Sequence, residues 1–218
     1  MKLLHWLGAP GLLLAIACGP LDRSPAFCAV PIDGAPLRGN PEARVKIVEF
    51  ADFECPYCRA VESTLRALLQ ERPEKVALSF RHAPSGSHPH ALAAALSAVC
   101  AQDQGLFWEL HDAMIEPGAA LDDDSVLAYA DTVGLDTELW QDCRASNGAY
   151  LRLEADLQLA SEANVTATPS FFVNGRALIG AKPLEVFLDY VDEAQAAAAA
   201  SDLSAEEYYA TLQEQPCH

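Results

Sequence analysis

A strand that leads into a Cys-x-x-Cys segment and then a helix is the feature that most constrains how this chain can fold. Residues 45–50 (VKIVEF) are mostly apolar and β-branched, which is typical of a buried strand. From Val61 to Leu69 apolar residues recur at helical spacing, and Cys55 and Cys58 lie between the two patterns. The pattern indicates an α/β fold whose chemistry lies at this strand-to-helix junction.

The two cysteines are expected to have different surroundings. Pro56 suits the first turn of a helix, because its ring presets φ and it lacks an N–H that the helix does not need. Cys55 then lies at the helix N-terminus, where unpaired N–H groups and the macrodipole favour the thiolate. Cys58 is one turn later, close enough to form a disulfide with Cys55. We predict that Cys55 is an exposed attacking thiol and that Cys58 is a more buried resolving thiol.

Two structural interpretations of the Cys-x-x-Cys pair remain as alternatives. Half of a zinc site would need a second Cys or His pair. The sequence has no second Cys-x-x-Cys, and His88 and His90 flank a proline without a partner pattern. A purely structural Cys55–Cys58 disulfide would close too short a loop to stabilise the chain much. The context therefore favours redox chemistry without a metal.

A second signal lies far downstream, where Thr168 and Pro169 precede an apolar run. Asn174 and Gly175 separate that run from another, which is typical of a hairpin turn. The motifs that follow one another along the chain are Glu49 to Cys58, His88-Pro89, Phe107-Trp108 to His111, and Thr168-Pro169 with its hairpin.

This ordered set resembles the thioredoxin superfamily and, within it, most closely the DsbA-like thiol:disulfide oxidoreductases. The resemblance covers residues 44–195, and the whole set is far more specific than Cys-x-x-Cys alone. It implies a thioredoxin fold, in which helices flank a central mixed sheet, as a domain over 45–195. It also implies a helical domain inserted at about 87–163.

The inserted domain is also expected from the residues themselves. Apolar spacing and capping residues predict several successive helices between strands, more than a minimal thioredoxin fold has. The expected helices cover residues 89–101, 107–115, 125–133, 136 to about 148, and 150–160.

The resemblance also implies roles for residues around the cysteines. Pro169 should be cis and lie beside Cys55. A cis X-Pro bond is uncommon, so it would indicate a required local geometry. The backbone at Thr168 would then pair with an extended substrate segment. Glu49 should be a buried acid that exchanges protons near Cys58, since burial raises a carboxyl pKa. The alternative is an exposed Glu49 at a sheet edge.

Other residues near the site receive simpler interpretations. Phe53, Pro56 and Tyr57 are expected to line an apolar substrate groove, by analogy with the family. Asp52 and Glu54 are expected to be solvated loop acids. The histidines expected to be core or capping residues rather than catalytic bases are His82, His88, His90 and His111.

The remaining cysteines suggest structural disulfides. Related proteins often pair cysteines within the inserted domain, so the resemblance implies a Cys100–Cys143 bridge. Cys28 and Cys217 are then left, and whether they pair to join the two ends of the domain stays open.

The N-terminal region is typical of an exported protein. Residues 1–17 carry one Lys and an interrupted apolar segment too short to span a bilayer, as in a signal peptide. The sequence LAIAC resembles a bacterial lipobox, which makes Cys18 the expected lipid acceptor; ordinary signal-peptidase cleavage at the same bond is the alternative. The Pro- and Gly-rich residues 18–44 predict an extended tether. We therefore expect a location in the bacterial cell envelope (periplasm), with a membrane anchor at Cys18.

The charge of the chain restricts its partners. With 14 Lys and Arg against 31 Asp and Glu, the formal net charge is -17. Such a surface repels phosphate backbones and argues against nucleic-acid binding. Residues 196–218 contribute to this charge and are expected to form an acidic helical tail.

These observations predict a thiol:disulfide oxidoreductase of the cell envelope that acts as an oxidase. Its partners would be unfolded or thiol-containing exported proteins and a membrane-bound recycling oxidase, and it would need no cofactor beyond its own redox-active disulfide. A disulfide reductase or isomerase is the main alternative, because Pro56-Tyr57 resembles glutaredoxin-type sites. A non-catalytic binding lipoprotein on a thioredoxin scaffold is a more distant one.

Overall fold

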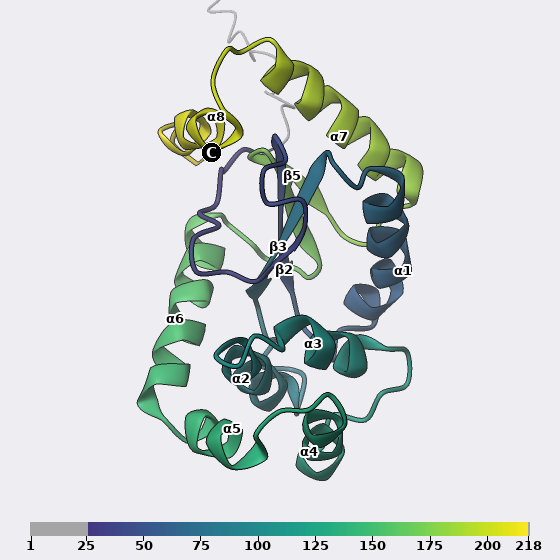
Figure 1. The fold of residues 1–218 in the computed structure, drawn as a ribbon, viewed down its shortest axis with the longest axis vertical. Coiled ribbons are helices and arrows are strands. Elements are labelled where there is room, and N and C mark those ends of the chain that lie inside the picture. The colour runs from purple at the N-terminus through teal and green to yellow at the C-terminus, as the bar shows by residue number, and fades with distance from the viewer. Residues whose placement is uncertain (1–25, 218) are drawn as a thin grey trace, which may run out of the picture.

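The computed structural model describes residues 26–217, in which helices flank a five-stranded mixed sheet, as predicted (Figure 1). The strand order is β1-β3-β2-β4-β5. Strands β2 and β3 are parallel, and the other neighbouring pairs are antiparallel. The strands are β1 (Leu37–Gly39), β2 (Val45–Ala51), β3 (Val76–His82), β4 (Ser170–Val173) and β5 (Arg176–Ile179).

Each face of the sheet is covered by helix. Helices α1 (Pro56–Glu71) and α7 (Leu184–Ala199) lie on one side, and α6 (Asn147–Glu162) lies on the other (Figure 1). All residues of β2 are buried, because this strand is central and has covered faces. The apolar run that predicted a buried strand thus forms the middle of the core.

The inserted domain consists of α2 to α6 and caps the sheet near the start of α1 (Figure 1). Trp140 is fully buried in its core, and its Nε1 donates to the Ser97 carbonyl at 2.9 Å. The helix expected to continue to about residue 148 ends at Arg144, because Ser146 caps α6 through the Ala149 N–H. Besides α6, the helices of the inserted domain are α2 (Ala91–Gln102), α3 (Phe107–Ile115), α4 (Asp123–Thr132) and α5 (Thr137–Arg144).

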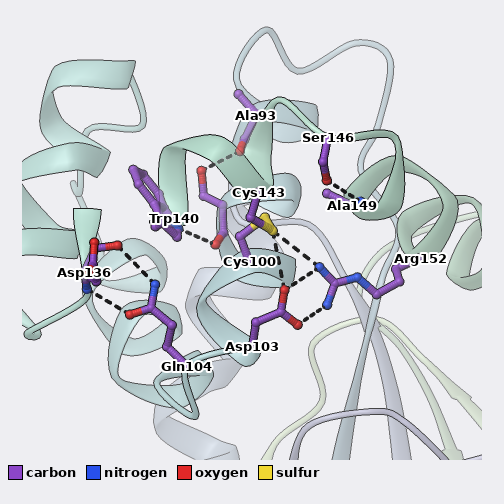
Figure 2. Close-up of a disulfide and its surroundings, with 11 residues drawn as sticks. Ala93, Cys100, Asp103, Gln104, Asp136, Trp140, Cys143, Ser146, Ala149 and Arg152 are labelled. Carbon is purple, nitrogen blue, oxygen red and sulfur yellow. Dashed lines mark hydrogen bonds and ion pairs between the residues drawn. A yellow bond between two sulfur atoms is a disulfide. The ribbon is translucent and has the colours of Figure 1, made fainter. Parts of the chain in front are cut away.

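Two disulfides join distant parts of the chain. Cys100 of α2 is bonded to Cys143 of α5, within the inserted domain (Figure 2). Cys28 is bonded to Cys217, so this pairing joins the N-terminal segment to the C-terminal one. Both bridges link segments that lie far apart in sequence.

The N-terminal segment differs from the expectation of a free tether. That expectation is wrong for residues 26–44, where β1 pairs with β3 and Val30 is buried against the sheet. A Pro- and Gly-rich segment can still dock when its few apolar side chains find an open sheet face. The predicted signal peptide (1–17), the rest of the tether and Cys18 lie outside the described residues.

The C-terminal tail is packed rather than separate. The expected boundary at residue 196 falls inside α7, and a second helix, α8 (Ala205–Gln213), follows. Ser204 and Glu207 form a capping box at its start. The hydroxyl of Tyr209, which is 3% exposed, donates to the Val30 carbonyl at 2.7 Å. The tail and the N-terminal segment therefore stabilise each other.

Within residues 26–217, none of the helices has both the length and the apolar character that a membrane span requires.

Candidate active site

Cys55 lies at the N-terminus of α1, as its neighbour Pro56 predicted. It is the N-cap residue, with extended φ and ψ, and its N–H donates to the Asp52 carbonyl at 3.1 Å. The expectation of an exposed Cys55 is wrong: this residue is 5% exposed, against 1% for Cys58. The neighbouring loop at Thr168 covers it, so only a small part of Cys55 faces solvent.

Cys55 is nevertheless poised as a thiolate. Its pKa is lowered to about 5, chiefly by a hydrogen bond from the Cys58 side chain. Burial acts in the opposite direction, while the Thr168 side chain and the N–H groups of Cys58 and Tyr57 lower the pKa further. Those N–H groups belong to the first helical turn, where they have no acceptor within the helix.

Cys58 and Glu49 form the buried side of the site. Burial raises the pKa of the Cys58 thiol far above its usual range, and the hydrogen bond that this thiol donates to Cys55 raises it further. Glu49, on β2, is 3% exposed, and burial raises its carboxyl pKa well above the usual range, with a contribution from Glu62. The charge of Glu49 also acts on Cys58. A carboxyl group with a raised pKa that acts on a buried thiol is suited to proton exchange with that thiol.

The second motif lies directly beside Cys55. The Thr168–Pro169 peptide bond is cis, as the resemblance implied. The Thr168 carbonyl oxygen is 3.4 Å from the Cys55 sulfur. Pro169 is buried at the start of β4, and its carbonyl accepts the Gly180 N–H at 2.8 Å. The sheet therefore holds this loop against the Cys55 thiol.

The residues expected to line a substrate groove are not all placed together. Tyr57 is 66% exposed beside the cysteines, and Pro56 is exposed as well. Phe53 is 1% exposed and stacks on Phe80 at 5.4 Å between ring centroids. The assignment of Phe53 to the groove is therefore wrong: the inserted domain offers it an aromatic core that its sequence position did not reveal.

A cleft runs beside the cis peptide bond. Ser85 and His88 line one wall, and Leu157 and Ser161 of α6 line another. The loop from 165 to 168 closes it next to Cys55. Its walls are mostly small apolar and hydroxyl side chains, which suit an extended polypeptide segment.

Asp52 and His88 were not expected to belong to the site. Asp52 is 2% exposed, so its assignment as a solvated loop acid is wrong. Its Oδ2 accepts from His88 Nδ1 at 2.7 Å and from the Ser85 N–H at 2.8 Å, and its Oδ1 accepts from the Glu54 N–H at 2.8 Å. The position of His88 in the motif set was the only signal in the sequence that could have indicated it.

Arg59 was also missed, and it joins the two halves of the molecule at this site. Its Nε donates to the Phe53 carbonyl at 2.8 Å, and its Nη1 donates to the carbonyls of Glu116 and Ala119. The side chain therefore fixes the loop after α3 to the segment that carries Cys55.

His82 and His111 are core residues, as expected. His82 is 2% exposed, and burial lowers its pKa to about 4. His111 is 1% exposed and contacts the rings of Phe53 and Phe107. Neither of these two histidines lines the cleft beside Cys55.

One group within residues 26–217 has ligand atoms close enough for a metal ion. These atoms, from Glu62, His111 and Asp112, lie within 4.8 Å of one another. Arg38 already bonds Asp112 at 2.8 Å, and Arg66 bonds Glu62 at 3.2 Å. The carboxylates are thus balanced by guanidinium groups, which makes this an ion-pair network.

Comparison with known families agrees with this geometry. The sequence model of the family described as thioredoxin matches residues 33–193. This chain belongs to the thioredoxin family. The family and fold inferred from the ordered motifs are thereby confirmed.

Solved structures of the thioredoxin family resemble this chain closely. A thioredoxin-like oxidoreductase from Silicibacter pomeroyi DSS-3 has a TM-score of 0.69 at 32% identity, covering 74% of this chain and 92% of its own. The thiol-disulfide exchange protein α-DsbA2 from Wolbachia pipientis has a TM-score of 0.66 at 26% identity, covering 73% and 86%. The structural neighbours are therefore DsbA-like.

A curated relative of this thioredoxin-family chain is much longer. The Na(+)/H(+) antiporter NhaA 1 of Salinispora arenicola (strain CNS-205) is 36% identical over 174 residues, which make up 79% of this chain and 26% of the antiporter. The chain spans about a quarter of the length of the curated relatives it matches.

Proposed function

We propose that this protein is a thiol:disulfide oxidoreductase that donates disulfides to protein substrates through Cys55 and Cys58. The observation that carries the proposal is the opposite behaviour of two thiols one turn apart. The pKa of Cys55 is lowered to about 5, while that of Cys58 is raised. A stabilised thiolate at Cys55 favours the reduced enzyme and therefore makes the disulfide a good oxidant.

The reaction starts from the Cys55–Cys58 disulfide. A substrate thiolate attacks the Cys55 sulfur, the Cys55–Cys58 bond breaks, and its electron pair goes to the Cys58 sulfur. Cys58 takes up a proton, which the Glu49 carboxyl would supply. A second substrate thiolate then attacks the substrate sulfur of the mixed disulfide, and Cys55 leaves as a thiolate. The substrate loses two electrons, and the enzyme gains them.

The substrate is proposed to be an extended segment of an unfolded or thiol-containing exported protein. The backbone at Thr168 lies beside Cys55 and would pair with such a segment through main-chain hydrogen bonds. Exposed Tyr57 offers an apolar contact next to the attacking sulfur. Main-chain pairing gives affinity with little dependence on substrate sequence.

The proposed location is the cell envelope, where disulfides persist. Lipidation of Cys18 would hold the enzyme at a membrane, and a membrane-bound, quinone-linked oxidase would reset its disulfide. Two disulfides outside the site are consistent with an oxidising compartment. No metal, nucleotide or flavin takes part in the proposed exchange.

A reductase or isomerase is the second candidate. The specific observation in its favour is the Pro56-Tyr57 dipeptide between the cysteines, which resembles glutaredoxin-type sites. The same site would then start from the Cys55 thiolate and attack a substrate disulfide, with an electron donor in place of the oxidase.

The test has two parts, activity and potential. Oxidation of a reduced, unfolded substrate should fall by about 10³-fold or more in Cys55→Ser, because that variant lacks the attacked sulfur. A double Cys28→Ser/Cys217→Ser variant is the control, since it leaves Cys55 and Cys58 in place. Undiminished exchange in Cys55→Ser would reject this mechanism, and a wild type without exchange above the uncatalysed rate would point to a non-catalytic scaffold.

The reduction potential of the Cys55–Cys58 pair, measured in graded glutathione buffers, decides the direction. A value above about -150 mV supports a disulfide donor. A value below about -220 mV would instead identify a reductase or isomerase.

A further inference from the structure

His88 lies in the inserted domain's first loop, yet its partners belong to the cysteine loop. Its Nδ1 is 2.7 Å from Oδ2 of Asp52, and the side chain of Asp52 is fully buried. The Asp52 carbonyl in turn accepts the Cys55 N–H at 3.1 Å. Asp52 therefore holds His88 through its side chain and Cys55 through its backbone.

The position of His88 also brings it to the open side of the site. It lines the cleft together with Ala167 and Thr168, and the Thr168 carbonyl lies 3.4 Å from the Cys55 sulfur. His88 is thus placed on the same cleft through which a substrate would reach Cys55.

We propose that His88, held by Asp52, is an electrostatic positioning residue that stabilises the Cys55 thiolate and so sets the oxidising strength of the disulfide. This inference deepens the proposed function and depends on it for its biological meaning. His88 neither attacks nor accepts the substrate, and it acts only through the charge it presents near Cys55.

The charges around His88 explain why it should matter. The titratable groups that face it are Asp52 and Glu54 on the cysteine loop and Cys55 at the start of α1. The opposite wall of the cleft, formed by α6 and the loop from 165 to 168, contributes no charged side chain. Without an imidazolium, the Asp52 carboxylate is an unbalanced negative charge close to Cys55, which disfavours a thiolate.

The charge of His88 depends on pH. The hydrogen bond to Asp52 raises the pKa of His88 above its usual value of 6.5. The imidazolium is therefore present below this raised pKa, and its effect is lost as pH rises through it. Reduction of the disulfide takes up two electrons and one proton and yields a Cys55 thiolate and a Cys58 thiol. A cation beside that thiolate raises the reduction potential.

The main experiment compares two neighbouring histidines. His88→Gln keeps a hydrogen-bond donor for Asp52 but carries no charge, and His90→Gln is the control two residues away, where the side chain is exposed. We expect His88→Gln to raise the Cys55 pKa, measured by thiolate absorbance, by about one unit, which is a tenfold smaller acid dissociation constant of the Cys55 thiol. The reduction potential should fall by about 30 mV, the equivalent of that tenfold change. His90→Gln should change neither.

The pH profile separates a charge effect from a structural one. Potentials of the wild type and His88→Gln should differ below the raised pKa of His88 and converge above it, where the wild-type ring is neutral. A constant difference at all pH values would mean that the variant merely disturbs the loop, and would overturn the proposal.

A third measurement needs no variant. If His88 stabilises the Cys55 thiolate, the thiolate must stabilise the protonated His88 by the same free energy. The pKa of His88, followed by NMR, should therefore be higher in the reduced protein than in the oxidised one. Equal values in the two states, or equal Cys55 pKa values in His88→Gln and His90→Gln, would refute the inference. Either result leaves the proposed function untouched, because that depends on the loss of exchange in Cys55→Ser.

Discussion

The Cys55–Cys58 pair and the Cys100–Cys143 pair show how surroundings decide what two cysteines do. Cys55 caps a helix, lies beside a cleft and has its thiolate stabilised chiefly by a hydrogen bond from Cys58 and further by first-turn N–H groups. Cys100 lies inside α2, is 1% exposed and is bonded to a cysteine of another helix. The first pair can release a stable thiolate at Cys55, whereas a thiolate at Cys100 would lie in an apolar core.

The loops that the two pairs close differ as much as their surroundings. Cys55 and Cys58 are one helical turn apart, so their disulfide restricts the unfolded chain very little. Cys100 and Cys143 are 43 residues apart, so their disulfide restricts it strongly. A redox disulfide therefore adds little stability to the fold when it forms, whereas a structural disulfide is hard to reduce.

The largest expected effect on stability comes from removing the structural bridge. The Cys100→Ala/Cys143→Ala variant should lose about 4 kcal/mol of unfolding free energy in urea, from the entropy of its closed loop. The Cys55→Ser/Cys58→Ser variant is the matched control and should lose less than about 1 kcal/mol. Similar losses in the two variants would remove the distinction between the pairs.

A smaller effect concerns the pH dependence of the reduced site. The pKa of Cys55 is about 5 in the folded protein, below its ordinary value of 9.0. Its thiolate therefore stabilises the reduced protein fully above pH 9, and this contribution is lost as pH falls through 5.

Solvent in the cleft screens part of this contribution. Reduction of Cys55–Cys58 should raise the free energy of unfolding, and we expect that gain to be about 3 kcal/mol smaller below pH 5 than above pH 9. Urea unfolding at several pH values, in glutathione buffer that opens only this pair, measures it. The oxidised protein serves as the control, and a pH-independent difference would contradict the assignment of Cys55 as the thiolate.

The smallest effect concerns a cation near the structural bridge. Arg152 pairs with Asp103, and its Nη2 lies 3.4 Å from the Cys143 sulfur (Figure 2). It would favour a Cys143 thiolate, so Arg152→Gln should make this disulfide harder to reduce, by tenfold or less, equivalent to about 1 kcal/mol. Quantitative alkylation in graded dithiothreitol measures the shift.

Arg176→Gln is the matched control for that variant. Its side chain is 38% exposed, against 40% for Arg152, and it also forms an ion pair, with Glu193. It should not change the reduction of Cys100–Cys143, because Arg176 lies on β5, outside the inserted domain that holds this disulfide. Equal shifts in the two variants would show that Arg152 acts only through general stability.

Much of the site could be predicted because its main features are local. The strand, the first-turn proline and the spacing of Cys55 and Cys58 fall within fourteen consecutive residues, 45–58, and short-range geometry places them. The cis bond at Pro169 was accessible through the ordered set of motifs. The docking of residues 26–44 was not, because a Pro- and Gly-rich composition does not reveal whether a distant sheet offers an uncovered face.

The sequence by itself determined that a strand leads into a helix capped by Cys55, with Cys58 one turn further on, because backbone sterics and helix periodicity act over a few residues. Only the tertiary structure decided that Asp52 is buried against His88, that Phe53 belongs to the core and that Cys55 is covered by the loop at Thr168. These contacts join residues 27 to 113 positions apart, and their formation depends on how the inserted domain packs against the sheet.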